Sequence, residues 1–237
     1  MILIIAGLLI SLHWLTFFGT IKVSNVSITL ALLSTGAFFT SILEPIFYKR
    51  NFVGYEILFG LLVITGLYLI FQVETKHTLG IILGLISAFL SAVFTLINGK
   101  LIKETAPSVI SFYELLTGVA AISIYLAILS LGSDGEKGFN VAFFILSAED
   151  WLYLLILASI CTAYAFIAAV AVMKHLSPYT VMLTINLEPV YGIFLAFLIF
   201  GSKEQMNPQF YYGAMLILST VILNGYLKIK WKINKLS

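Results

Sequence analysis

The sequence predicts an all-α integral membrane protein, and three observations support this prediction. Hydrophobic residues make up 61% of the 237 residues and charged residues only 10%, with a mean hydropathy of +1.07. A water-soluble fold of this composition would lack enough polar surface to cover itself. Eight apolar stretches fill most of the chain, each near the ~20 residues that a helix needs to cross a bilayer. They run over about 2–18, 28–48, 52–71, 79–98, 108–131, 151–172, 179–200 and 209–227.

A membrane-spanning β-barrel would also satisfy every backbone polar group in lipid, and so it is the competing fold. It requires strands of about ten residues in which apolar and polar side chains alternate. Runs such as Ile81–Ile86 and Ile193–Phe200 are continuously apolar. The sequence therefore predicts eight transmembrane helices.

Basic residues separate onto two sides of the predicted membrane. One side carries nine Lys and Arg residues and the other carries four. Because positively charged loops stay in the cytoplasm, we expect the nine-residue side and both termini inside, in a bacterial inner membrane. The nine are Lys49, Arg50, Lys100, Lys103, Lys174, Lys228, Lys230, Lys232 and Lys235, and the four are Lys22, Lys76, Lys137 and Lys203.

The longest predicted loop, 132–150, falls on the outer side and ends in a helix-start signal. Ser147 is followed three residues later by Asp150, directly before the apolar stretch that opens with Trp151. This spacing predicts a capping box.

An internal repeat organises the spans. An offset of 152 residues places 18–48 on 170–200 and brings Lys22 into register with Lys174. We therefore predict an incomplete first repeat of three spans over 1–73 and a complete second repeat of five spans over 78–228. A basic cytoplasmic tail, 229–237, follows. A five-span unit has an odd number of crossings, so its two copies have inverted topology, a frequent construction of secondary transporters.

Four motifs in the second repeat suggest a family. They are Gly80-Ile-Ile-Leu-Gly84, Asn186-Leu-Glu-Pro-Val190, Gly201-Ser-Lys-Glu204 and Tyr212-Gly213. With them the repeat resembles EamA-type permeases of the drug/metabolite transporter superfamily. The resemblance implies ten helices in two five-helix repeats around a central cavity, with both termini in the cytoplasm. Relative to that pattern the chain lacks the equivalent of the first two helices, as expected of a fragment or a reduced form.

Ionisable residues at membrane depth are costly and so mark candidate sites. Glu188 lies about ten residues into its span, with Thr184 and Tyr191 at i−4 and i+3, and Pro189 follows it. The pattern favours a cavity carboxylate that binds a cationic group or carries a proton. The alternative is a hydrogen-bonded glutamate that locks two helices.

Glu114 and His13 are the next candidates, and both have open alternatives. Glu114 has Ser111 and Thr117 on its helix face, where a transport role and helix packing fit equally. His13, beside Trp14 near mid-depth, either joins helices by a hydrogen bond or relays protons with Glu188.

One face of the fourth span carries small and polar residues. The glycines and serines among them predict a packing seam, which Thr95 and Asn98 extend towards a cavity. The face comprises Gly80, Gly84, Ser87, Ser91, Thr95 and Asn98. The full predicted substrate pathway is Glu188, Glu114, His13, Trp14, Thr184, Asn186, Tyr191, Thr95, Asn98 and Tyr164.

These patterns predict a secondary transporter of small metabolites or drug-like solutes, with proton coupling as an option, and not an enzyme. The sequence has no Walker-type loop and no metal-ligand cluster, so no cofactor or metal is expected. The expected partners are a small solute, the lipid bilayer and, as an option, a second copy in a homodimer, but no nucleic acid. The alternatives are an intramembrane enzyme, with His13 and a carboxylate as general base, and a non-transporting assembly protein.

Overall fold

All regular structure in the described residues is helical, which confirms the predicted all-α class. The computed structural model describes residues 1–49, 51, 54–73, 77–131, 138, 144–185, 188–201 and 206–234. The chain folds into two compact units, and helices α1 and α5 contribute residues to both. Unit 1 comprises Met1–Ser11 and Ile97–His175, and unit 2 comprises Leu12–Leu96 and Leu176–Ser237. The predicted repeats, 1–73 and 78–228, follow a different division and stay a prediction.

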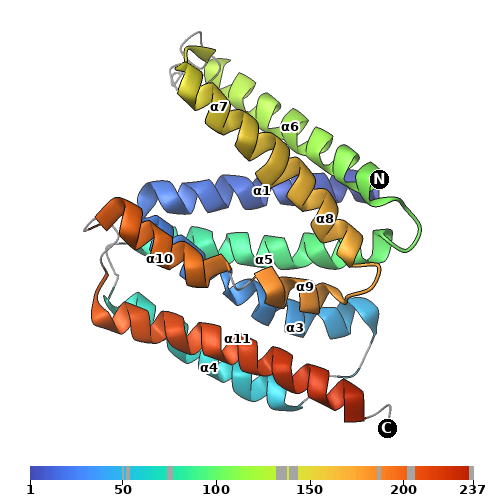
Figure 1. Cartoon of the computed structure of the whole chain (residues 1–237), viewed down its shortest axis with the longest axis vertical. Coiled ribbons are helices and arrows are strands. Elements are labelled where there is room, and N and C mark those ends of the chain that lie inside the picture. The colour runs from blue at the N-terminus through green and yellow to red at the C-terminus, as the bar shows by residue number, and fades with distance from the viewer. Residues whose placement is uncertain are drawn as a thin grey trace. The chain divides into compact units, whose positions relative to one another are not determined.

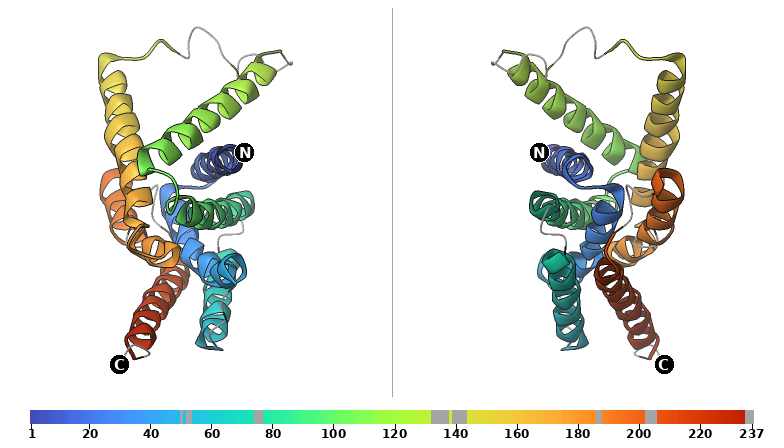
Figure 2. Two further views of the ribbon diagram at one scale, coloured as in Figure 1. Left: turned by 90° about the vertical axis from the view of Figure 1, so that its right-hand side faces the viewer. Right: turned by 90° about the vertical axis from the view of Figure 1, so that its left-hand side faces the viewer.

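Unit 1 is built on one long helix that contains a π-helical segment. Helices α7, η4 and α8 follow one another without a break, and α8 packs against α6. Figure 2 shows α6 and α7 diverging from that contact. The elements of unit 1 are the start of α1 (Ile2–Val23), the end of α5 (Thr78–Leu101), α6 (Pro107–Leu131), α7 (Ala148–Ile156), the π-helix η4 (Leu157–Tyr164) and α8 (Ala165–Val172).

The predicted capping box at the start of α7 is confirmed. Ser147 Oγ accepts a hydrogen bond from the Asp150 backbone N–H at 3.1 Å, and Asp150 Oδ2 accepts from the Ser147 N–H at 3.3 Å. These two bonds satisfy amide donors that a helix start otherwise leaves without an intrahelical partner.

Unit 2 is assembled from three helix pairs: α4 with α11, α2 with α10, and α3 with α9. Figure 1 shows α4 and α11 side by side. Besides its parts of α1 and α5, the unit contains α2 (Val26–Leu33), α3 (Thr35–Tyr48), α4 (Gly54–Val73), α9 (Pro178–Ile185), α10 (Glu188–Phe200) and α11 (Pro208–Asn234).

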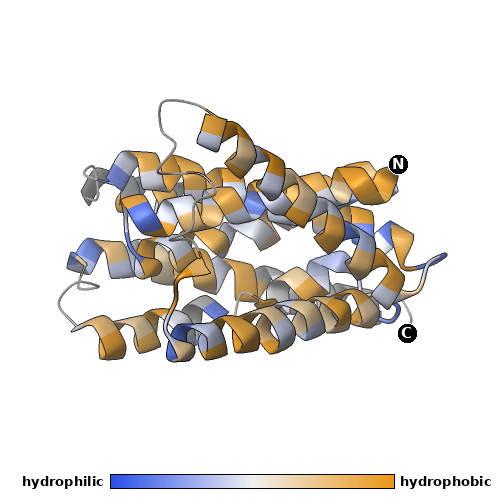
Figure 3. Cartoon of the chain, turned by 90° about the horizontal axis from the view of Figure 1, so that it is seen from above, coloured by the Kyte–Doolittle hydropathy of each residue, from blue (hydrophilic) through white to orange (hydrophobic). Residues whose placement is uncertain are grey.

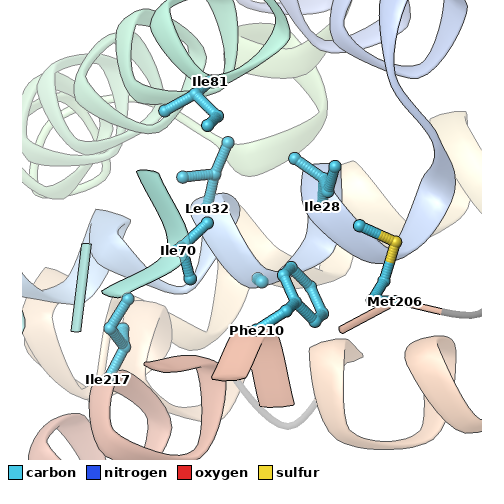
Figure 4. Close-up of a cluster of buried hydrophobic side chains, with 8 residues drawn as sticks. Ile28, Leu32, Ile70, Ile81, Met206, Phe210 and Ile217 are labelled. Atoms are coloured by element: carbon cyan, nitrogen blue, oxygen red, sulfur yellow. The ribbon is translucent and has the colours of Figure 1, made fainter. Parts of the chain in front are cut away.

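Side chains from α2, α4, α5 and α11 meet in the core of unit 2 (Figure 4). Because lipid tails are as apolar as these side chains, the cluster holds the helices together mainly by close van der Waals packing. Its buried members are Ile28, Ala31, Leu32, Ile70, Ile81, Met206, Phe210 and Ile217.

Helices α2 and α3 form one apolar segment with a bend at Ser34. The Ser34 hydroxyl donates to the Ala31 carbonyl at 2.6 Å, and the Thr35 hydroxyl donates to the Leu32 carbonyl at 2.6 Å. Such side-chain bonds compete with the helical pattern and bend helices. In the apolar part of this segment 67% of the residues are buried, so it is an interior element of unit 2.

Six helical segments in the described part of the chain are long and apolar enough to cross a membrane. Apolar residues predominate along the helices (Figure 3), and many large apolar side chains are exposed. The predicted stretch 52–71 corresponds to α4, and 179–200 corresponds to α9 and α10. The total of eight spans stays a prediction. The six segments are Ile2–Val23, Val26–Tyr48, Thr78–Leu101, Pro107–Leu131, Ala148–Val172 and Pro208–Leu227.

Candidate functional site

Two of the predicted pathway residues, Asn98 and Glu114, are in direct contact inside unit 1. Asn98 Nδ2, near the end of α5, donates to Glu114 Oε2, on the second turn of α6, at 3.1 Å. Asn98 is 1% exposed and Glu114 is fully buried. A loop of five residues joins the two helices, so their facing positions meet soon after the turn. A buried carboxylate is thus held by a single amide donor.

Three oxygen atoms of this buried cluster have no hydrogen-bond partner among the described residues. They are Asn98 Oδ1, Glu114 Oε1 and Ser111 Oγ. Ser111 is 1% exposed and lies three residues before Glu114, on the same face of α6. An unpartnered buried polar atom costs about 1–3 kcal/mol, so the cluster is a costly feature of the fold.

The start of α1 covers α6 beside Glu114, and glycine permits the close approach. A Cβ atom added to Gly7 would lie 2.6 Å from the Glu114 carbonyl oxygen and 2.6 Å from Thr117 Cβ. On α6, Gly118 faces the Gly7 carbonyl oxygen. The sequence prediction missed Gly7, although Gly7 and Ser11 form the small residue pair at i and i+4 that marks close helix packing.

His13 joins α1 to α5 within unit 2. Its Nδ1 lies 2.9 Å from the Ser87 carbonyl oxygen, and the Ser87 hydroxyl lies within 3.2 Å of the His13 carbonyl oxygen. Nδ1 also lies 2.9 Å from the Ser87 hydroxyl oxygen. Because a carbonyl only accepts, the contact with the Ser87 carbonyl assigns a proton to Nδ1. The ring also packs against Phe17 and Phe94. The neighbouring Trp14 is half-buried.

The predicted packing face of α5 is buried, as expected. Within unit 2, a Cβ on Gly80 would lie 2.8 Å from Ser24 Cβ, and one on Gly84 would lie 2.6 Å from Leu32 Cδ1. Further along the face, Thr95 donates to Met182 Sδ of α9 at 3.5 Å. The α5 face therefore contacts the helix that precedes Glu188 in the chain.

Glu188 is the first residue of α10, and its side chain is exposed. One and two turns later, Gly192 and Ala196 lie on the same helix face. A Cβ on Gly192 would lie 2.5 Å from Leu30 Cδ1, and Ala196 is 4% exposed. Glu188 therefore lies at the start of α10, on the helix face that packs within unit 2 at Gly192 and Ala196. Its side chain is nevertheless accessible.

The other predicted pathway residues lie on several helices of the two units. Tyr191 is exposed on α10, one turn after Glu188, while Thr184 is exposed on the separate helix α9. Asn186 lies outside the described residues. Tyr164, at the end of the π-helix in unit 1, is 70% exposed. No group of three or more His, Cys, Asp and Glu side chains that could hold a metal occurs within the described ranges.

Membrane-length apolar helices with an apolar outer surface define the class: the chain is an integral membrane protein. A model of the EamA-like transporter family matches residues 78–226, more than half of the chain. The chain belongs to this family, which confirms the resemblance drawn from its motifs.

Comparison with solved structures supports the fold. A structure described only as "Crystal structure of protein" superposes with a TM-score of 0.63 at 13% sequence identity. The match covers 97% of this chain and 77% of the other chain. No curated protein matches the chain.

Proposed function

We propose that the chain is a secondary transporter of small metabolites or drug-like solutes. Membership of the EamA-like transporter family is the observation that carries this proposal. Proton coupling belongs to the proposal, because carboxylates occur in the membrane-spanning helices and can carry a proton. Inverted repeats, with both termini in the cytoplasm of a bacterium, would let the two halves expose a central site to either side.

Glu188 is the proposed solute contact. Its carboxylate is accessible and begins the inward face of α10, a position suited to a cationic or hydrogen-bonding solute group. Thr184, Asn186 and Tyr191 supply neighbouring polar groups in the sequence. We assign Thr95 and Trp14, which belong to the same unit, to the wall of the same route.

A non-transporting assembly protein is the second candidate. The contact between His13 and Ser87 favours it, because it joins two helices. The contact between Asn98 and Glu114 also favours it, because it joins α5 to α6. An intramembrane enzyme is the weaker alternative, because the matching family is one of transporters. A homodimer is compatible with either function.

Flux measurements in proteoliposomes test the transport proposal. The purified full chain would be assayed with a panel of labelled amino acids, amines and organic cations, under imposed proton gradients. We expect Glu188→Gln to lower flux about tenfold or more, equivalent to about 1.4 kcal/mol. The matched control is Glu149→Gln, a change to an exposed glutamate in the first turn of α7.

One result would contradict the assignment of the site, and another would contradict the transport function itself. Unchanged flux and pH dependence in Glu188→Gln would show that the site is wrongly assigned. Absence of flux for every solute with the wild-type chain, folded as judged by its melting transition, would favour the assembly protein.

A further inference from the structure

The buried cluster of Asn98, Ser111 and Glu114 has more oxygen atoms than the described protein satisfies. One carboxylate oxygen, one amide oxygen and one hydroxyl oxygen have no partner among the described residues. All three side chains are at most 1% exposed. Asn98 and Glu114 are in contact, and Ser111 lies one turn before Glu114 on the same face of α6. A shared ligand would therefore account for all three unpaired atoms, each of which alone would cost about 1–3 kcal/mol.

The need to compensate the charge of the Glu114 carboxylate limits which ligand could occupy this site. The described basic residues of unit 1, Lys100, Lys103 and Lys174, are all exposed, so none is buried with Glu114. A proton on Glu114 would neutralise the carboxylate but supply one donor for several acceptors. A water molecule could bond to the oxygens but would leave the charge uncompensated. A single small monovalent cation would compensate the charge and also bind the unpaired oxygen atoms.

The ligand types agree with this assignment. Carboxylate, amide and hydroxyl oxygens are hard donors. Such donors bind hard cations in preference to transition metals. The cluster contains a single carboxylate, which balances one positive charge but not two. We propose that Asn98, Ser111 and Glu114 form a binding site for one monovalent cation of the sodium class.

An open pocket lies close to this cluster along the chain. It has a volume of about 630 Å³ at the turn between α5 and α6 and includes Ile102 and Glu104 in its lining. Ile102 is one helical turn beyond Asn98, and the charged residues of the lining are Glu104, Lys103 and Lys174. The pocket brings solvent to within one turn of Asn98 along the chain.

The close approach of α1 fixes the backbone of α6 at Glu114. Because Gly7 lies directly against the Glu114 backbone, even a methyl group there would displace α1 or α6. At Gly118 an added Cβ would lie 3.7 Å from its nearest neighbour, which is an ordinary contact. Gly7→Ala and Gly118→Ala are therefore a matched pair for testing whether this packing supports cation binding.

Sodium binding can be measured without a transport assay. The full chain in detergent would be melted in NaCl, KCl or choline chloride at constant ionic strength and pH, and ²²Na⁺ binding would be measured in parallel. We expect one bound Na⁺ per chain. We also expect the melting temperature to rise by about 5 °C or more at a hundred times the dissociation constant.

Substitutions at and beside the proposed site test whether sodium binds there. Glu114→Gln should abolish the sodium-specific rise, Ser111→Ala and Gly7→Ala should weaken sodium affinity about tenfold, and Gly118→Ala should leave it unchanged. Ser111→Ala removes only a hydroxyl group, so it tests the site even where Glu114→Gln does not fold.

Equal melting temperatures in the three salts would overturn the proposal. If both Glu114→Gln and Ser111→Ala bind sodium with the affinity of the wild-type chain, the proposal is also overturned. A melting temperature that depends on pH through Glu114, but not on sodium, would assign the cluster to a proton and reject the cation. None of these outcomes depends on flux or on Glu188, so the transport proposal is tested separately.

Discussion

Gly66 of α4 and Gly213 of α11 lie against each other's backbone. A Cβ atom on Gly66 would lie 2.9 Å from the Gly213 carbonyl oxygen, and one on Gly213 would lie 2.8 Å from the Gly66 carbonyl oxygen. The contact is reciprocal, and α4 and α11 form the most extensive helix pair of unit 2. Close backbone approach at small residues is the main way in which helices associate in lipid.

Gly66→Ala should therefore destabilise the protein by about 1–3 kcal/mol, because the new methyl group overpacks a contact with backbone. Thermal unfolding in detergent measures the loss. Gly19→Ala is the control, since its Cβ would meet only Leu83 Cδ1, at 3.5 Å. That change should be neutral or stabilising, because alanine favours a helix. Equal effects of the two substitutions would refute the close crossing.

His13→Phe should cost more stability than Ser87→Ala. The first removes the Nδ1 contacts with both the Ser87 carbonyl and the Ser87 hydroxyl, whereas the second removes the hydroxyl contacts and leaves the bond to the carbonyl in place. Hydrogen bonds between membrane helices average about 0.6 kcal/mol and reach about 1.7 kcal/mol. Unfolding free energies of both variants, with Ser91→Ala as a buried serine control on the same face, check this order. A larger loss in Ser87→Ala would contradict it.

Ser147→Ala should loosen the first turn of α7 and cost about 1 kcal/mol, because it removes the acceptor of the Asp150 N–H. Hydrogen exchange of the Asp150 amide should accelerate accordingly. Ser147→Thr retains a hydroxyl at the cap and should preserve protection. If the alanine variant exchanges at the wild-type rate, the capping box has no role in stability.

Features set by local pattern were predictable from the sequence. The all-α class follows from apolar length, the Ser147 cap from a four-residue signal, and the buried α5 face from helical spacing. Each depends on residues near one another in the chain, so no knowledge of the partner helix is needed.

Features that depend on tertiary contacts were not predictable. Asn98 and Glu114 were each candidates, but their pairing depends on how α5 and α6 face one another. Gly66 is a single glycine in an apolar stretch, and only the opposing backbone of Gly213 makes it essential. The π-helix over Leu157–Tyr164 also escaped prediction, because nothing in its sequence LASICTAY separates π from α geometry.

Alternating access of the proposed kind requires two sets of helices in opposite orientations, so membrane topology is the most direct measurement. Single cysteines at Lys22 and Lys174, equivalent positions of the two predicted repeats, would be introduced after the exposed Cys161 is replaced by alanine, and labelled with an impermeant maleimide. We predict that Lys22→Cys reacts from outside intact cells, whereas Lys174→Cys reacts only after permeabilisation. Labelling of Lys22→Cys and Lys174→Cys from the same side would contradict the inverted arrangement and the carrier built on it.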